Sequence, residues 1–210
     1  MGQVIGLLGG TFNPVHNGHV YLVKKCLEEY TFDRFLVVPS GNAYHKLGKQ
    51  KILSGSHRFF MCQLAFKWLP QVEVVTFELE KTGPTRTYHT LTELKALYPG
   101  SHLLWLLGSD SFCTIDQWYR YQEVLQLATF IVVMRGTDTR SEIEARNASF
   151  KFPAHLLFLN SLNSPISSTY IRHCFRCRQD VPKGWLPNDV MNYIKRHHLY
   201  NPLTKGVYDY

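Results

Sequence analysis

Apolar and polar positions alternate along the chain in blocks that predict strands and helices in regular succession. The opening run 3–8 is mostly apolar and is typical of a buried strand, and 18–30 carries apolar residues at the spacing of one helical face. A second short apolar run follows at 34–38. A strand, a helix and a strand of these lengths form a βαβ unit, which predicts a parallel sheet with a right-handed crossover.

The same alternation continues after this first unit. The pattern predicts helices over 59–69, 90–98 and 118–127, and strands over 72–77, 103–107, 129–134 and 156–159. We therefore expect an α/β fold with a doubly wound, Rossmann-like parallel sheet. The segments 39–54 and 81–87 lack clean periodicity and are predicted loops. Because loops at the carboxyl ends of parallel strands line the ligand crevice, 39–54 is a candidate substrate wall.

The last part of the chain changes character. Helical patterns near 168–177 and 188–197 are separated by turn residues, and no strong further strand follows the one at 156–159. The sequence predicts a single domain over 1–210, with a parallel α/β core over 1–160 and a small helical C-terminal part over 161–210. At 210 residues the chain is long enough to bury a full hydrophobic core.

Composition narrows the setting of the protein. Lys and Arg number 23 against 16 Asp and Glu, a net charge of +7 that favours anionic partners, although the basic residues are scattered as on an ordinary solvated surface. No run reaches the roughly 18 apolar residues of a membrane helix, and no signal-peptide pattern opens the chain, so we expect a cytoplasmic protein with no membrane partner. The five cysteines fit a reducing compartment. Cys174 and Cys177 form a lone CxxC on a predicted helix, and without a second pair this pattern does not predict metal or redox chemistry.

The segment that joins the first strand to the first helix has the most informative composition. Residues 9–19 read GGTFNPVHNGH. The two glycines allow a tight turn and a close approach to a ligand, and a helix that begins at Asn17 offers unpaired N–H groups at its positive end. His16 and His19 can donate hydrogen bonds to phosphate oxygens as imidazole or imidazolium. These features predict a phosphate-binding turn, although a lone HxxH is more often an ordinary helix start.

Other nucleotide and catalytic motifs are absent from the sequence. It contains no GxxxxGK[ST], no GxGxxG after the first strand and no GxSxG. A second phosphate-binding element occurs instead at 166–172, which reads ISSTYIR. Hydroxyls ahead of a helix cap its N–H groups, the same N–H groups can hold triphosphate oxygens, and Arg172 adds charge one turn later. A lone Ser-Ser-Thr is more often a simple cap, but its occurrence together with the first motif favours a nucleotide site.

Together these two motifs resemble the signature pair of the HxGH nucleotidyltransferase superfamily. The marks between them are similar to those of the bacterial nicotinate-nucleotide adenylyltransferases, so the resemblance covers almost the whole chain. These marks are Pro39, His45-Lys46, Ser56-His57-Arg58, 85–91, Gly108-Ser109-Asp110 and Trp118. The resemblance implies transfer of the adenylyl group from ATP to nicotinate mononucleotide, giving deamido-NAD and pyrophosphate, with a homo-oligomer left open and no nucleic-acid partner.

The resemblance also implies roles for particular residues. The implied catalytic residues are His16, His19, Lys46 and Arg172. The implied ATP-binding residues are Gly9, Gly10, Thr11, Phe12, Gly18, Gly108, Asp110, Ser167, Ser168 and Thr169. The implied mononucleotide-binding residues are Asn13, Thr87 and Trp118. At three of these residues an ordinary structural role is the alternative to the implied functional one. Lys46 is then a solvated loop lysine, Trp118 a core aromatic residue and Asp110 a helix cap.

The implied reaction requires no protein nucleophile, because the 5′-phosphate of the mononucleotide attacks. The protein must align two anions and neutralise them, and we expect His16, His19, Lys46, Arg172 and Mg²⁺ to supply the positive charge. The motif at 9–19 has no acidic pair, so Mg²⁺ is expected to be held by phosphates and water, with no protein ligand.

Two positions depart from the family pattern, and three alternatives stay open. Arg86 stands where the family often has Tyr, and Asn13 stands where it more often has Asp. The first departure bears on how the mononucleotide is held, whereas the second is isosteric and is expected to cost little. The alternatives are an adenylyltransferase for nicotinamide mononucleotide, one for phosphopantetheine, against which the chain length and His16 argue, and a non-catalytic nucleotide sensor.

Overall fold

The computed structural model describes residues 2–41, 52–160, 164–201 and 208–209. Within these residues the chain forms a six-stranded sheet in the order β4-β2-β1-β5-β6-β7, in which every neighbouring pair is parallel. The strands are β1 (Val4–Gly10), β2 (Arg34–Pro39), β4 (Val72–Val74), β5 (His102–Gly108), β6 (Thr129–Val133) and β7 (Leu156–Leu159). The chain moves outward from β1 to β4 and then returns to the other side of β1, so the winding reverses between β1 and β5. The predicted doubly wound fold is confirmed, and this reversal is where such sheets bind ligands.

Helices follow the strands as the periodicity predicts, with some corrections. They are α1 (Asn17–Glu29), α2 (Gly55–Phe66), α3 (Thr87–Leu97), α4 (Ser109–Cys113), α5 (Tyr121–Leu127), α6 (Arg140–Ala148), α7 (Ser168–Arg176) and α8 (Asn188–Arg196). The helix predicted over 118–127 begins only at Tyr121, because a 3₁₀ turn, η2 (Ile115–Gln117), precedes it and Arg120 has a left-handed φ of 53°. Two elements, α4 and α6, were not predicted.

Two short strands also occur where none was predicted. The two-residue strands β3 (Ile52–Leu53) and β8 (Tyr208–Asp209) pair antiparallel with each other, outside the main sheet. The sequence predicted no strong further strand after β7, and β8 is only two residues long. Two residues are too few to produce a detectable alternation, and the pairing joins segments far apart in the sequence.

The core consists of two hydrophobic clusters, one on each face of the sheet. Along β2, Phe35 and Val37 belong to one cluster while Leu36 and Val38 belong to the other. Because both faces are buried, the strands are continuously apolar rather than alternating, which explains the sequence pattern. Helices α1, α2, α7 and α8 supply buried residues to the first cluster, and α3 to α6 supply the second.

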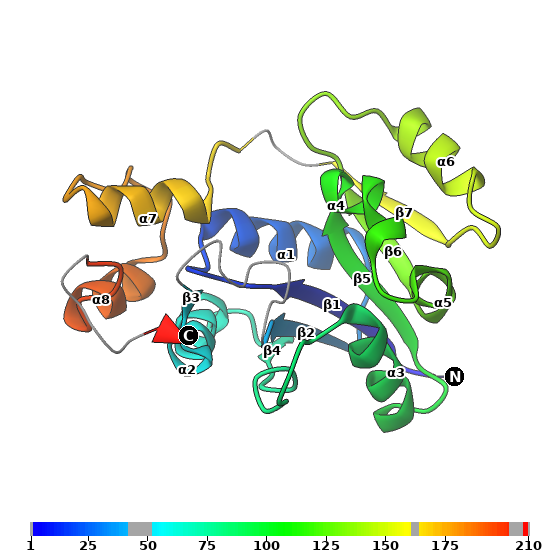
Figure 1. Ribbon diagram of the computed structural model, residues 1–210, viewed down its shortest axis with the longest axis horizontal. Coiled ribbons are helices and arrows are strands. Elements are labelled where there is room, and N and C mark those ends of the chain that lie inside the picture. Colours follow the sequence, from blue (N-terminus) through cyan, green and yellow to red (C-terminus); the bar gives the residue numbers. More distant parts are fainter. Residues whose placement is uncertain (1, 42–51, 161–163, 202–207, 210) are drawn as a thin grey trace.

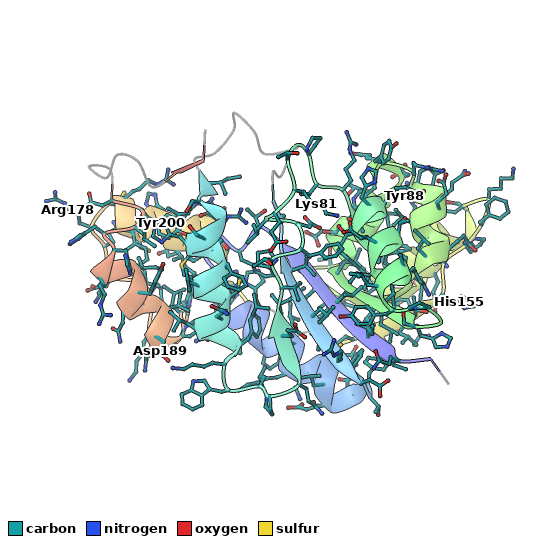
Figure 2. The ribbon with its side chains drawn as sticks, turned by 90° about the horizontal axis from the view of Figure 1, so that it is seen from below. Lys81, Tyr88, His155, Arg178, Asp189 and Tyr200 are labelled. Carbon is teal, nitrogen blue, oxygen red and sulfur yellow. The ribbon has the colours of Figure 1, made fainter. Side chains whose placement is uncertain are left out.

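The C-terminal helices are joined to the sheet through the first of these clusters. Figure 1 shows α7 and α8 grouped at one end of the molecule, beside α1 and α2. In Figure 2, Tyr200 lies with these helices, at the opposite end from Tyr88 on α3. Among the residues described, no helix is both long enough and apolar enough to cross a bilayer.

Candidate active site

The candidate site is built on the turn that leaves β1 at the edge where the winding of the sheet reverses. Phe12 is buried and has a φ of 47°, a conformation that costs energy for a bulky residue. The following Asn13–Pro14 peptide bond is cis. The N–H of Ser40, just after β2, donates to the carbonyl of Gly10 at 2.8 Å. The turn is thus held in an unusual shape against the next strand.

The two histidines of this turn stack on each other at the start of α1. Their ring centroids are 3.7 Å apart, and the N–H of His16 donates to Nδ1 of His19 at 3.2 Å. Because Nδ1 accepts, a neutral His19 ring carries its proton on Nε2 and can donate from there. Phe12 packs edge-on against His19 at 5.1 Å. A Cβ at Gly18 would lie only 3.0 Å from the His16 ring, so glycine permits this close arrangement.

His16 is buried and neutral at neutral pH in this structure. Burial, reinforced by the nearby positive charge of Arg135, lowers the pKa of His16 to about 4. Its Nδ1 is buried and has no hydrogen-bond partner within the described part of the chain. His16 is therefore neutral without a bound anion, and the positive charge expected of it when the substrates are bound stays a prediction.

This shift makes the stability of the protein depend on pH. Between the unfolded pKa of 6.5 and the folded pKa of about 4, the unfolded chain binds a proton at His16 that the folded chain does not. Stability from this group is therefore present above pH 6.5 and is lost as the pH falls toward 4, by on the order of 2 kcal/mol between about pH 7 and about pH 5. Urea unfolding of the wild type and of His16→Asn at these two pH values should show that the variant loses correspondingly less stability. The same loss in both proteins would contradict the assignment, and His155→Asn, at an exposed position, serves as the control.

The second motif packs directly on the first, as the sequence predicted. Ser168, the first residue of α7, donates from Oγ to the carbonyl of Pro14 at 2.8 Å, across 154 residues. Arg172 donates from Nη1 to the carbonyl of Asn13 at 2.8 Å and from Nη2 to Oγ1 of Thr169 at 3.2 Å. Ser167 caps α7 by accepting from the N–H of Tyr170 at 3.2 Å. The helix start therefore lies against the turn after β1, and its hydroxyl residues Ser167 and Thr169 are exposed there.

Arg172 and the start of α1 are already engaged within the protein. Arg172 is 8% exposed, and its burial lowers its pKa. Its guanidinium holds the turn after β1 in place through Asn13. The N–H of Asn17 donates to the carbonyl of Trp185 at 2.9 Å. The first helix thus offers fewer N–H groups to a ligand than its sequence suggested.

Asn13 faces the interior rather than the crevice. It is 3% exposed, and its Oδ1 accepts from the N–H of Leu53 at 3.3 Å and from the hydroxyl of Tyr200 at 2.9 Å. A contact between Asn13 and the mononucleotide stays a prediction, and in this structure the Asn13 side chain is engaged inside the protein. Its oxygen accepts two donors, which a carboxylate oxygen would also do, and the departure from Asp is therefore accommodated.

Arg58, at the start of α2, is a buried support of the site that sequence analysis noted only as part of the resemblance. It is 1% exposed and donates from Nε to the carbonyl of Leu53 at 2.9 Å. Its Nη1 donates to the carbonyl of Thr11 at 3.0 Å and to that of Ser40 at 2.6 Å. One guanidinium therefore connects the turn after β1, the end of β2 and β3.

A second cation that the sequence analysis missed lies at the ends of β5 and β6. Arg135 follows β6, is exposed, and its N–H donates to Oγ of Ser109 at 3.0 Å. Its Nη1 lies 3.7 Å from Oδ2 of Asp110, and a Cβ at Gly108 would lie 2.8 Å from its Nε. Since Arg135 also acts on the pKa of His16, its charge reaches the turn after β1. A cation directly after a parallel strand beside the reversal point was the signal that could have identified it.

The other two predicted mononucleotide residues lie at the start of α3 and just after η2. Thr87 is the first residue of that helix, and Trp118 is half-buried against the second hydrophobic cluster. A Cβ at Gly41, close to the end of β2, would lie 2.8 Å from Cγ2 of Thr85. The segment leading into α3 therefore borders the carboxyl end of β2, beside the turn after β1.

Some predictions are not tested by the structure. Lys46 lies outside the described residues. The thiols of Cys174 and Cys177 are free, the first buried and the second exposed. Within the described residues, no group of three or more His, Cys, Asp or Glu side chains is arranged to hold a metal ion.

Comparisons with known proteins agree in pointing to nucleotidyltransferases. The model of the cytidylyltransferase-like family matches residues 7–174. A protein of Albidiferax ferrireducens named "Probable nicotinate-nucleotide adenylyltransferase" is 38% identical over 200 residues, covering 93% of this chain and 97% of its own. One of Staphylococcus epidermidis with the same name is 35% identical, covering 95% and 98%.

A solved structure has the same fold. It is a nicotinic acid mononucleotide adenylyltransferase of Plasmodium falciparum complexed with NaAD. The TM-score is 0.76 at 22% identity, covering 94% of this chain and 97% of the other. At this identity the likeness supports the arrangement of strands and helices described above.

Proposed function

The chain belongs to the nicotinate-nucleotide adenylyltransferases of the cytidylyltransferase-like family, and we propose that it transfers the adenylyl group of ATP to nicotinate mononucleotide, forming deamido-NAD and pyrophosphate. It is thus a nucleotidyltransferase of NAD biosynthesis. The observation that carries the proposal is the contact between α7 and the turn after β1, where Ser168 binds Pro14 and Arg172 binds Asn13. This contact gathers two phosphate-binding elements at the edge where doubly wound sheets bind nucleotides.

The chemistry is an in-line displacement at the α-phosphorus of ATP. A 5′-phosphate oxygen of the mononucleotide forms the new P–O bond, the bond to the β-phosphate oxygen breaks, and pyrophosphate leaves with that electron pair. The substrate is its own nucleophile, so the protein acts by alignment and by stabilising charge. No covalent enzyme intermediate is required.

We assign the phosphate contacts as follows. His19 donates from Nε2 to an α-phosphate oxygen, and His16 beside it takes up a proton when the triphosphate binds, because an anion raises the pKa of a buried imidazole. The exposed hydroxyls of Ser167 and Thr169 and the N–H groups at the start of α7 hold the β- and γ-phosphates. Arg172 maintains the turn, and Arg135 adds positive potential.

The remaining proposed contacts involve the protein backbone, the two ends of the dinucleotide and a metal ion. The backbone of 9–12 and Gly18 approaches ATP closely, while Gly108 and Asp110 line the adenosine side and Thr87 and Trp118 the pyridine side. Mg²⁺ would neutralise phosphate charge, held by phosphates and water because residues 9–19 contain no carboxylate. Lys46 stays a proposed phosphate ligand. A cytoplasmic location, where ATP is available, belongs to the same proposal.

A direct assay tests the substrate. The purified protein is supplied with ATP, Mg²⁺ and either nicotinate or nicotinamide mononucleotide, and pyrophosphate and the dinucleotide are measured. We expect deamido-NAD with a kcat/KM at least about tenfold above that for the amide, the difference of a single well-placed charged contact. A preference for the amide would overturn the substrate, and ATP binding without pyrophosphate release would favour a nucleotide sensor.

A further inference from the structure

Two arginine–tyrosine stacks join the start of α3 to the segment before α5. The guanidinium of Arg86 lies over the ring of Tyr119, with Cζ 4.6 Å from the ring centroid. In the opposite direction, Arg120 lies over Tyr88 at 4.3 Å, and the two tyrosine rings meet edge to face at 5.9 Å. The two segments are thus tied by a reciprocal pair of contacts, which we call the Arg–Tyr clasp.

The two arginines of the clasp have different surroundings. Arg120 is exposed and also pairs at 2.8 Å with Glu123 in the first turn of α5. Arg86 is the residue that precedes α3 and is half-buried, and its partner Tyr119 follows Trp118. The positive end of the α3 dipole lies at the same point. Arg86 therefore adds its charge to a helix start that already favours an anion, beside the proposed pyridine residues Thr87 and Trp118.

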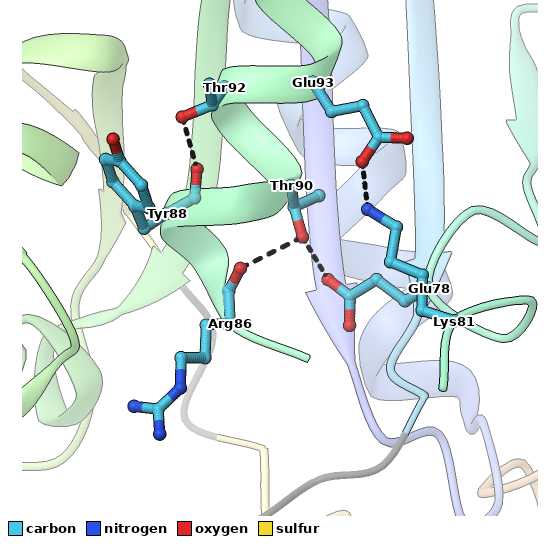
Figure 3. A network of polar contacts seen from close by, with 7 residues as sticks. All are labelled: Glu78, Lys81, Arg86, Tyr88, Thr90, Thr92 and Glu93. Atoms are coloured by element: carbon cyan, nitrogen blue, oxygen red, sulfur yellow. Dashed lines mark hydrogen bonds and ion pairs between the residues drawn. The ribbon is translucent and has the colours of Figure 1, made fainter. Parts of the chain in front are cut away.

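Open space borders Arg86. A cavity of about 560 Å³ lies between the segment 81–86 and α3, and Thr85, Arg86 and His89 line it. Figure 3 shows the Arg86 guanidinium extending away from Lys81 and Glu78. Both acidic groups there are engaged, since Glu93 pairs with Lys81 and Glu78 accepts from Oγ1 of Thr90 at 2.6 Å.

We propose that Arg86 is a specificity determinant that binds the carboxylate of the nicotinate ring, with Tyr119 fixing the plane of its guanidinium. The inference rests on the proposed function. Nicotinate mononucleotide carries a carboxylate on its pyridine ring, and nicotinamide mononucleotide carries a neutral amide at the same position. A guanidinium stacked on a ring uses its face for the stack and its edge for a bidentate carboxylate contact. An amide has one oxygen and no charge to offer, so it gains less from the same group.

The test compares Arg86→Gln with the matched variant Arg120→Gln, which breaks the other half of the clasp. The specificity constants for nicotinate and nicotinamide mononucleotide are measured for each protein. In R86Q we expect kcat/KM for nicotinate mononucleotide to fall about tenfold or more, mainly through KM, with the amide value changed less than about twofold. In R120Q the ratio of the two constants should stay at the wild-type value, because any loosening of the clasp affects both substrates alike.

A purely structural role for Arg86 predicts equal losses for both substrates in R86Q, and an unchanged ratio would overturn the proposal. Arg86→Lys provides the second variant: it keeps the charge but loses the planar fork, and it should give an intermediate ratio. A ratio in R86K equal to that of the wild type would also count against a guanidinium-specific contact. A wild-type protein that turns over neither mononucleotide would refute the proposed function itself, which is a different result from an active enzyme whose preference ignores Arg86.

Discussion

Replacing His19 by alanine should lower the turnover of deamido-NAD by about 100- to 1000-fold, the usual cost of removing one preorganised donor to developing charge. The hydrogen bond from the His16 N–H to Nδ1 of His19 assigns the donor to Nε2, and the stacked His16 and the edge of Phe12 fix the ring. In the proposed site other groups hold the rest of the triphosphate, so the ATP dissociation constant should change only a few-fold. Initial rates at saturating substrates and calorimetric ATP binding give the two quantities.

Two further variants test whether the fall in turnover comes from the lost hydrogen-bond donor of His19. His19→Gln keeps an N–H donor on a side chain of similar reach and should recover part of the rate. His57→Ala removes a histidine bonded to Tyr193, between α2 and α8, and should leave turnover per folded molecule unchanged. Normal turnover in H19A, or ATP binding lost in proportion to the rate, would refute the transition-state role.

Replacing Arg58 by methionine should lower the free energy of unfolding by about 3–5 kcal/mol, the scale for removing one member of a buried charged network. The side chain is 1% exposed, and three backbone carbonyls, of Leu53, Thr11 and Ser40, would lose a charged donor in a place where water does not replace it. Urea denaturation measures the change. Because Thr11 belongs to the phosphate turn, the folded variant should also bind ATP more weakly.

The control for this substitution is Arg140→Met, on the exposed face of α6. Arg140 pairs with Glu144 one helical turn away at 2.8 Å, with both side chains at least half exposed, and such pairs contribute less than about 1 kcal/mol. If R58M proved as stable as R140M, the three carbonyls would have to be satisfied by other groups.

The parts of the fold that could be predicted are those whose apolar pattern is local. The parallel strands are buried on both faces, so runs such as 34–38 were recognisable without any tertiary information. Helix α4 spans only five residues, and α6 buries only Ile143, so neither carries an apolar stripe. The capping box of Thr139 and Glu142 was the one local signal for α6.

In the candidate site, too, the predictable features are those with a local sequence pattern. The turn after β1 and the start of α7 each have a local motif, and their contact could be predicted because each motif is incomplete alone. The inward placement of Asn13 and the neutral state of His16 could not be predicted. The first depends on Tyr200, far away in the sequence, and the second depends mainly on burial and then on the charge of Arg135, both of which require the folded structure.

The hydrogen bond between Asn13 and Tyr200 joins residues 187 positions apart in the sequence, and the hydrogen bond between Pro14 and Ser168 joins residues 154 positions apart. A ribosome-bound chain that has completed its sheet still lacks α7, whose start packs on the turn after β1. Under the proposed function, the protein becomes competent to consume ATP only once α7 and Tyr200 have left the exit tunnel.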